Sequence, residues 1–101
     1  MDAPIFIGDE WTAAGWRLAG ARVETPPPTT DAVADAFERA CADGPPLVLI
    51  SAGLASLLDA QRLARARAVL DPPVLVVGEA TGRHRPDDVA GDIRERMGVA
   101  R

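Results

Sequence analysis

Four short apolar runs divide the chain, and each is followed by a longer segment with apolar residues at helical spacing. Three of these runs are continuously apolar, which is typical of strands that are buried on both faces of a parallel sheet. The second run alternates and stops at three consecutive prolines, a pattern that predicts an edge strand. The predicted strands cover residues 3–7, 21–25, 47–50 and 74–77.

A helix is predicted after the first strand, and Gly20 ends it. Its apolar positions recur at i, i+3, i+4 and i+7 and therefore lie on one side of the helix. They are Trp11, Ala14, Gly15 and Leu18. Trp16 lies roughly 140° around the helix from Trp11, so one sheet cannot easily bury both, and one tryptophan is expected at the surface. Two arrangements stay open for Trp16: an exposed interface contact beside Arg17, or a side chain folded over the edge of its own core.

The second predicted helix follows the triple proline, with Thr30 as its N-cap and Asp31 at its positive end. One apolar stripe runs along this helix, and the Gly-Pro-Pro sequence at residues 44–46 ends it. The stripe consists of Val33, Ala36, Phe37, Ala40 and Cys41.

The third predicted helix opens at Ser51 and Gly53 and continues to the next proline pair. Its apolar residues spread over more than one face, so we expect a helix that is covered on two sides. They are Leu54, Leu57, Leu58, Leu63, Val69 and Leu70.

The last predicted helix covers residues 86–98, with Pro86 at its first position and Gly98 as its C-terminal cap. Its apolar stripe is thin and contains Val89, Ala90, Ile93 and Met97. A thin stripe docks weakly, so we expect this helix to move or to find its packing on a partner.

The order β-α-β-α-β-α-β-α predicts right-handed crossovers and a four-stranded parallel sheet with helices on both faces. We expect the strand order 2-1-3-4, a shortened flavodoxin-like, Rossmann-like three-layer sandwich. Residues 1–101 are expected to form a single domain, with a sheet-and-helix core over residues 1–79 and the C-terminal helix over residues 86–98.

Composition narrows the classes of function. The net charge of −4 disfavours a nucleic-acid binder, which needs a basic face to neutralise phosphates. Cys41 is the only cysteine, so an intramolecular disulfide and a cysteine metal cluster are excluded. The first residues do not have the pattern of a signal peptide, and no apolar run is long enough to span a bilayer. We therefore expect a cytoplasmic chain without direct membrane insertion.

Ligands of open α/β sheets bind beyond the carboxyl ends of the strands, so polar residues there are the candidates for chemistry. A phospho-acceptor receiver domain is disfavoured because Ser51 stands where the acceptor aspartate belongs and the chain has no lysine. Asp9 is instead expected to cap the first helix, and Ser51 to start the third. The strand-end residues are Gly8, Asp9, Glu10, Ser51, Gly78 and Glu79.

Other catalytic signatures are missing from the sequence. No phosphate-binding glycine loop follows any strand. His84 stands between two arginines without a second histidine or cysteine, which favours a solvated loop over a metal site. We therefore predict no catalytic, cofactor-binding or metal-binding residue.

The first strand runs into the motif Gly8-Asp9-Glu10-x-Thr12-x-x-Gly15-Trp16-x-Leu18-Ala19-Gly20. This motif resembles the opening of the F subunit of the rotary V/A-type (vacuolar/archaeal-type) ATPases, and the later strands and the charged terminal helix follow in that family's order. Trp16 replaces a phenylalanine of the family, and Trp11 stands where the family usually has an acidic residue. The sequence Val77-Gly78-Glu79 lacks the proline that commonly follows the last strand.

The resemblance implies a non-catalytic central-stalk protein that binds the coiled-coil D subunit of the stalk and turns with it, while ATP is handled elsewhere. It implies a location peripheral to the membrane through the ATPase complex, which translocates protons or sodium ions. It also implies that residues 87–101 form a regulatory segment that reaches toward the catalytic head subunits.

The surplus tryptophan and the thin terminal stripe motivate a set of predicted partner contacts, namely Trp16, Arg17, Ile93, Arg94 and Met97. An alternative from another class stays open. In that alternative the chain is a stand-alone small-molecule or anion-binding module that uses the strand ends near Gly8, Ser51 and Gly78.

Overall fold

The structure is a computed structural model and describes residues 2–78. The predicted helix over residues 86–98 lies outside the described residues, and so do the predicted contacts Ile93, Arg94 and Met97. None of the helices within residues 2–78 has the combination of length and apolar character that crossing a membrane requires.

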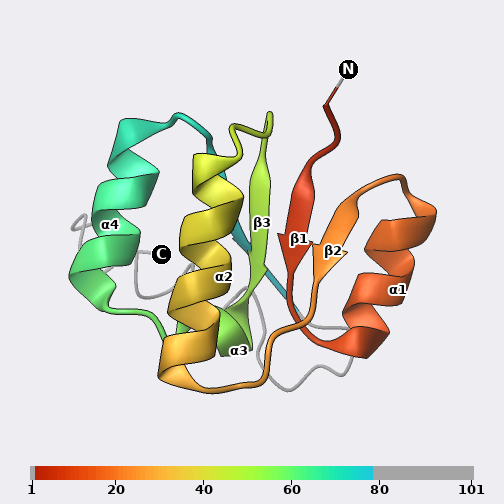
Figure 1. The fold of residues 1–101 in the computed structure, drawn as a ribbon, viewed down its shortest axis with the longest axis horizontal. Coiled ribbons are helices and arrows are strands. Elements are labelled where there is room, and N and C mark those ends of the chain that lie inside the picture. The colour runs from red at the N-terminus through yellow and green to blue at the C-terminus, as the bar shows by residue number, and fades with distance from the viewer. Residues whose placement is uncertain (1, 79–101) are drawn as a thin grey trace, which may run out of the picture.

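Four parallel strands form one sheet in the order β2-β1-β3-β4, which confirms the predicted topology. Figure 1 shows β3, β1 and β2 side by side. As the alternating pattern predicted, β2 lies at one edge of the sheet, and β4 forms the other edge. The strands are β1 (Ile5–Ile7), β2 (Arg22–Glu24), β3 (Val48–Ser51) and β4 (Val74–Val77).

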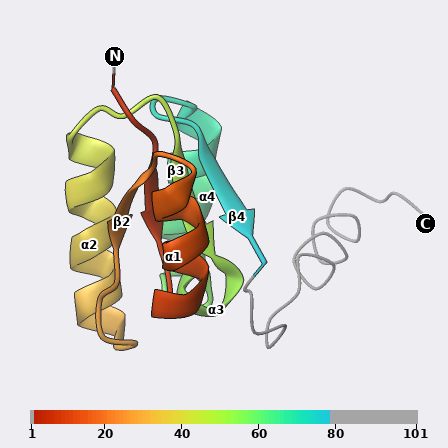
Figure 2. The ribbon, with the colours of Figure 1, turned by 90° about the vertical axis from the view of Figure 1, so that its right-hand side faces the viewer.

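Helices cover both faces of the sheet, so the fold has the three layers of the predicted sandwich, and Figure 2 shows β2 between α2 and α1. Successive strand residues point to opposite faces. Ile5 and Ile7 therefore pack against the helices that follow β2 and β3, whereas Phe6 packs against Ala13 of α1. The helices are α1 (Glu10–Leu18), α2 (Thr30–Ala42), α3 (Ala52–Ala55) and α4 (Ala60–Val69).

The second helix has the predicted stripe but begins one residue earlier than predicted. Thr29, in an extended conformation, is the N-cap, and its Oγ1 accepts a hydrogen bond of 3.3 Å from the backbone N–H of Ala32. Thr30 is already helical, so the prediction of Thr30 as the cap was wrong. Of the predicted stripe, Cys41 is half-buried and the other four residues are buried.

The third predicted helix is in fact two helices, which corrects the single helix expected from the sequence. The Ser56 hydroxyl donates to the carbonyl of Gly53 at 2.6 Å at the end of α3, and Asp59 caps α4 by accepting from Gln61 N–H at 3.1 Å. Leu54 lies in α3, Leu57 and Leu58 lie in the turn between the helices, and Leu63 lies in α4, which is why these leucines do not follow one helical period. The expected cover on two sides was also wrong, because no side chain of α4 is fully buried and Val69 is 67% exposed.

Gly8 links β1 to α1 at a point where a side chain has no space. A Cβ atom there would lie 2.3 Å from Cζ and 2.6 Å from Cε2 of Phe6. The Phe6 ring is fully buried and stacks on Trp16, with ring centroids 5.8 Å apart and an interplanar angle of 22°. Because the ring is fully buried and its face is stacked on Trp16, it cannot move away from Gly8 without disturbing the core.

Gly8→Ala is expected to lower the free energy of unfolding by about 1–3 kcal/mol, because the added methyl group overpacks the Phe6 ring. Urea denaturation measures this change. Gly15→Ala is the matched control, since no atom lies within 4 Å of a Cβ on Gly15. That control should stabilise the protein by about 0.5–1 kcal/mol, because alanine is the better helix former. Equal changes in the free energy of unfolding for the two substitutions would contradict the close contact between Gly8 and the Phe6 ring.

Candidate partner-binding surface

The turn between β1 and α1 is held by a pair of hydrogen bonds. Asp9 is the N-cap of α1, and its Oδ2 accepts from the backbone N–H of Thr12 at 3.0 Å. The hydroxyl of Thr12 donates to Asp9 Oδ1 at 2.6 Å. The side chain of Thr12 is buried, so both bonds lie on the inner side of the helix. The prediction that Asp9 caps this helix is confirmed.

These contacts determine the charge state of Asp9. Partial burial by itself would raise the pKa of the carboxyl group, because burial disfavours the charged form. The hydrogen bonds from the hydroxyl and the backbone N–H of Thr12 favour the carboxylate and outweigh burial, so the pKa of Asp9 lies below its ordinary value. Asp9 is therefore a charged carboxylate at the positive end of α1.

Other polar groups at the strand ends are also engaged in local structure. Ser51 is fully buried, and its Oγ accepts from the backbone N–H of Leu54 at 3.4 Å, which caps α3 as predicted. Glu10 Oε1 accepts from the hydroxyl of Thr25 at 3.0 Å, which ties the start of α1 to the segment after β2. Gly78 is half-buried, and Glu79 lies outside the described residues. Asp9, Glu10 and Ser51 therefore each hold a turn or a loop in place.

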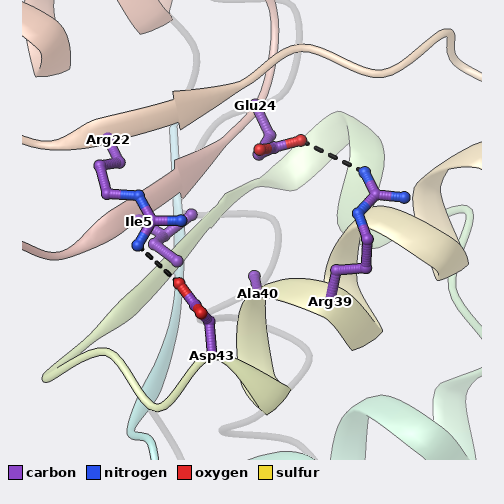
Figure 3. A pocket seen from close by; sticks show the side chains of 6 residues that line it. All are labelled: Ile5, Arg22, Glu24, Arg39, Ala40 and Asp43. Carbon is purple, nitrogen blue, oxygen red and sulfur yellow. Dashed lines mark hydrogen bonds and ion pairs between the residues drawn. The ribbon is translucent and has the colours of Figure 1, made fainter.

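A shallow hollow of about 210 Å³ lies between β2 and α2 (Figure 3). Its two guanidinium groups are paired with carboxylates: Arg22 with Asp43 at 2.6 Å, and Arg39 with Glu24 at 3.3 Å. Arg39 also pairs with Asp35, one turn earlier on α2. Since each cation already faces an anion, the hollow offers an incoming anion little net attraction. The residues that line it are Ile5, Arg22, Glu24, Arg39, Ala40 and Asp43.

The first helix has two apolar sides. Its inner side carries Thr12, Ala13 and the half-buried Trp16. The predicted apolar positions do share one side, but this side faces away from the sheet: Trp11 is 78% exposed and Leu18 is 91% exposed. Their small neighbours Ala14 and Gly15 are exposed as well. We call the four residues Trp11, Ala14, Gly15 and Leu18 the outer face of α1.

The structure decides between the two arrangements that the sequence left open for Trp16. Trp16 lies over its own core, stacked on Phe6, and the tryptophan that reaches the surface is Trp11. Arg17 is exposed, in the last turn of α1, and forms no ion pair with any residue within 2–78. The buried Thr12 and Ala13 and the stacking of Trp16 on Phe6 define the inner side of α1, so Trp11 lies on the outer side.

Comparison with known proteins does not assign the chain to a family. No protein-family model matches the chain, and no curated protein sequence matches it. The outer face of α1 is therefore identified as a candidate binding surface from its exposed apolar side chains alone.

The lowered pKa of Asp9 predicts a pH-dependent contribution to stability. The folded-state pKa lies below the unfolded value of about 3.9, so charged Asp9 stabilises the fold above that pH. This contribution is lost as the pH falls through the folded-state pKa. Asp9→Asn should be less stable than the wild type at pH 7 by about 0.5 kcal/mol, since solvent screens this partly exposed charge.

Urea denaturation at pH 7 and at pH 3 tests this prediction, with the difference between wild type and Asp9→Asn shrinking at the lower pH. Asp2→Asn makes the same change of net charge at an exposed position and serves as the control. A gap between wild type and Asp9→Asn that stays constant with pH would show that the Asp9 charge does not stabilise α1.

Proposed function

We propose that this chain is a non-catalytic central-stalk protein of a rotary V/A-type ATPase or ATP synthase, in the position of the F subunit. In this proposal the chain binds the coiled-coil stalk subunit and turns with it. The complex translocates protons or sodium ions, and other subunits handle ATP. The chain lies on the cytoplasmic side, peripheral to the membrane through the complex.

One observation carries the proposal: the segment with the family-like motif forms a rigidly capped helix whose outer face is apolar and exposed. Asp9 and Thr12 of the motif hold the start of the helix. Leu18 of the motif is 91% exposed, a state in which it contributes nothing to the core. An exposed apolar patch on a firmly anchored helix is typical of a surface that binds another protein.

A second consideration supports a binding role over a chemical one. The polar residues Asp9, Glu10 and Ser51 bind groups of the chain itself and thereby stabilise the edge where ligands of such sheets normally bind. The proposed function is mechanical coupling. In it, Arg17 contributes from α1, and Ile93, Arg94 and Met97 from the terminal segment. Trp16 contributes indirectly, because its stacking on Phe6 holds α1 on the sheet.

Co-expression with the coiled-coil stalk subunit and the catalytic head subunits tests the proposal. We expect a stable complex that contains one copy of this chain per coiled-coil subunit, measured by native mass spectrometry. Recovery of the chain with a bound small molecule and without the stalk subunit would instead support the binding-module alternative.

The terminal segment has its own test. Ile93→Asp and Met97→Asp should each weaken binding to the coiled-coil subunit at least tenfold, because a buried unpaired carboxylate is unfavourable at an apolar contact. Isothermal titration calorimetry measures the affinity. Val69→Asp, at an exposed position of α4, is the control for the added charge. Unchanged binding of both terminal variants would remove Ile93 and Met97 from the interface.

A further inference from the structure

Gly15 occupies a position that the fold does not require to be glycine. It lies in the middle of α1, where glycine destabilises a helix relative to alanine, and no atom lies within 4 Å of a Cβ built there. Two other glycines of this region are required by the structure of the chain itself. A side chain at Gly8 would overlap the Phe6 ring, and Gly20 has a φ of +99°. A glycine with no internal reason points to something that approaches α1 from outside.

The surroundings of Gly15 have the shape of a helix-packing site. Trp11 and Leu18 are seven residues apart, about 10 Å along the helix axis, and Ala14 and Gly15 form a low saddle between them. When two helices cross, side chains of one fit into the grooves of the other, and small residues at the crossing point let the two backbones approach closely. The two large side chains would then lie on either side of the incoming helix.

The charged residues of α1 and the apolar area of its outer face limit the kinds of molecule that can bind there. Glu10 and Arg17 stand at opposite ends of α1, so an incoming helix is complementary where it carries a basic residue near Glu10 and an acidic one near Arg17. The outer face alone offers on the order of 300–400 Å² of apolar surface. This is about half of the 800 Å² per partner that a stable interface needs, so two copies joined only through α1 would associate weakly.

One more exposed apolar side chain lies on the face of the sheet that α1 covers, at the level of the sheet. Leu75 of β4 pairs with Leu49, which packs with Ala13 under α1, so Leu75 points to the side of the sheet that α1 covers. Leu75 is 49% exposed. Three of the large exposed apolar residues within 2–78 therefore belong to this side, namely Trp11, Leu18 and Leu75.

We infer that the outer face of α1 binds a long α-helix of a partner protein, which crosses α1 at Ala14–Gly15 between Trp11 and Leu18. The inference rests on the proposed function for the identity of that partner, the coiled-coil stalk subunit. It assigns the contact to Trp11, Gly15 and Leu18, residues that were not among the contacts predicted from the sequence.

Gly15→Gln tests the inference because it separates binding from folding. The new side chain enters open space and improves helix propensity, so the midpoint of thermal denaturation should stay the same or rise. It also fills the saddle, so the dissociation constant for the coiled-coil subunit should increase at least tenfold. Ala64→Gln makes the same kind of change at an exposed position of α4 and should leave binding unchanged.

The affinity measurement and light scattering together distinguish three outcomes. If the wild type binds the coiled-coil subunit and Gly15→Gln binds equally well, the inference is wrong and the proposed function stands. If the wild type does not bind, the proposed function fails and the inference fails with it. If the isolated wild type is a dimer that Gly15→Gln dissociates, measured by light scattering, the occupant is a second copy and the inference is overturned.

Discussion

The stacking of Trp16 on Phe6 holds α1 against the sheet. The backbone N–H and the hydroxyl of Thr12 both bind the Asp9 carboxylate, which fixes the start of the helix, and the side chain of Thr12 is buried on the inner side. Residues four apart share a side of a helix, which places Trp16 on the same inner side. Trp16 there meets the ring of Phe6. This contact makes Trp16 part of the core and leaves Trp11 at the surface.

These contacts join α1 to the sheet at more than one point. The edge of the Phe6 ring lies against the backbone at Gly8, and its face stacks on the Trp16 ring. Glu10 adds a contact to Thr25 beyond β2. A helix fixed at its start and along its inner side can transmit a load from a bound partner to the sheet without first deforming. The proposed role in a rotor needs such a connection.

The sheet was predictable from sequence because continuously apolar runs between proline and glycine breaks locate the buried strands, and the handedness of the crossovers limits their order. The break between α3 and α4 was missed because leucines continue across it. The spacing of apolar residues did not predict which side of α1 faces the sheet. It indicates the side with Trp11 and Leu18, whereas the inner side carries the smaller Thr12 and Ala13 beside Trp16. The candidate surface was therefore only partly predictable. Gly15 became informative only when the structure showed open space around it, in contrast to the crowded Gly8.

The peripheral position of α4 has a consequence for how the molecule opens. No side chain of α4 is fully buried, and the helix is joined to α2 by the ion pair between Arg62 and Glu38 and to the core by the half-buried Leu63 and Ala66. Its detachment exposes little apolar surface, so the free energy of that local opening is well below that of global unfolding. We therefore expect the amides of α4 to exchange with solvent deuterium long before those of the central strands β1 and β3.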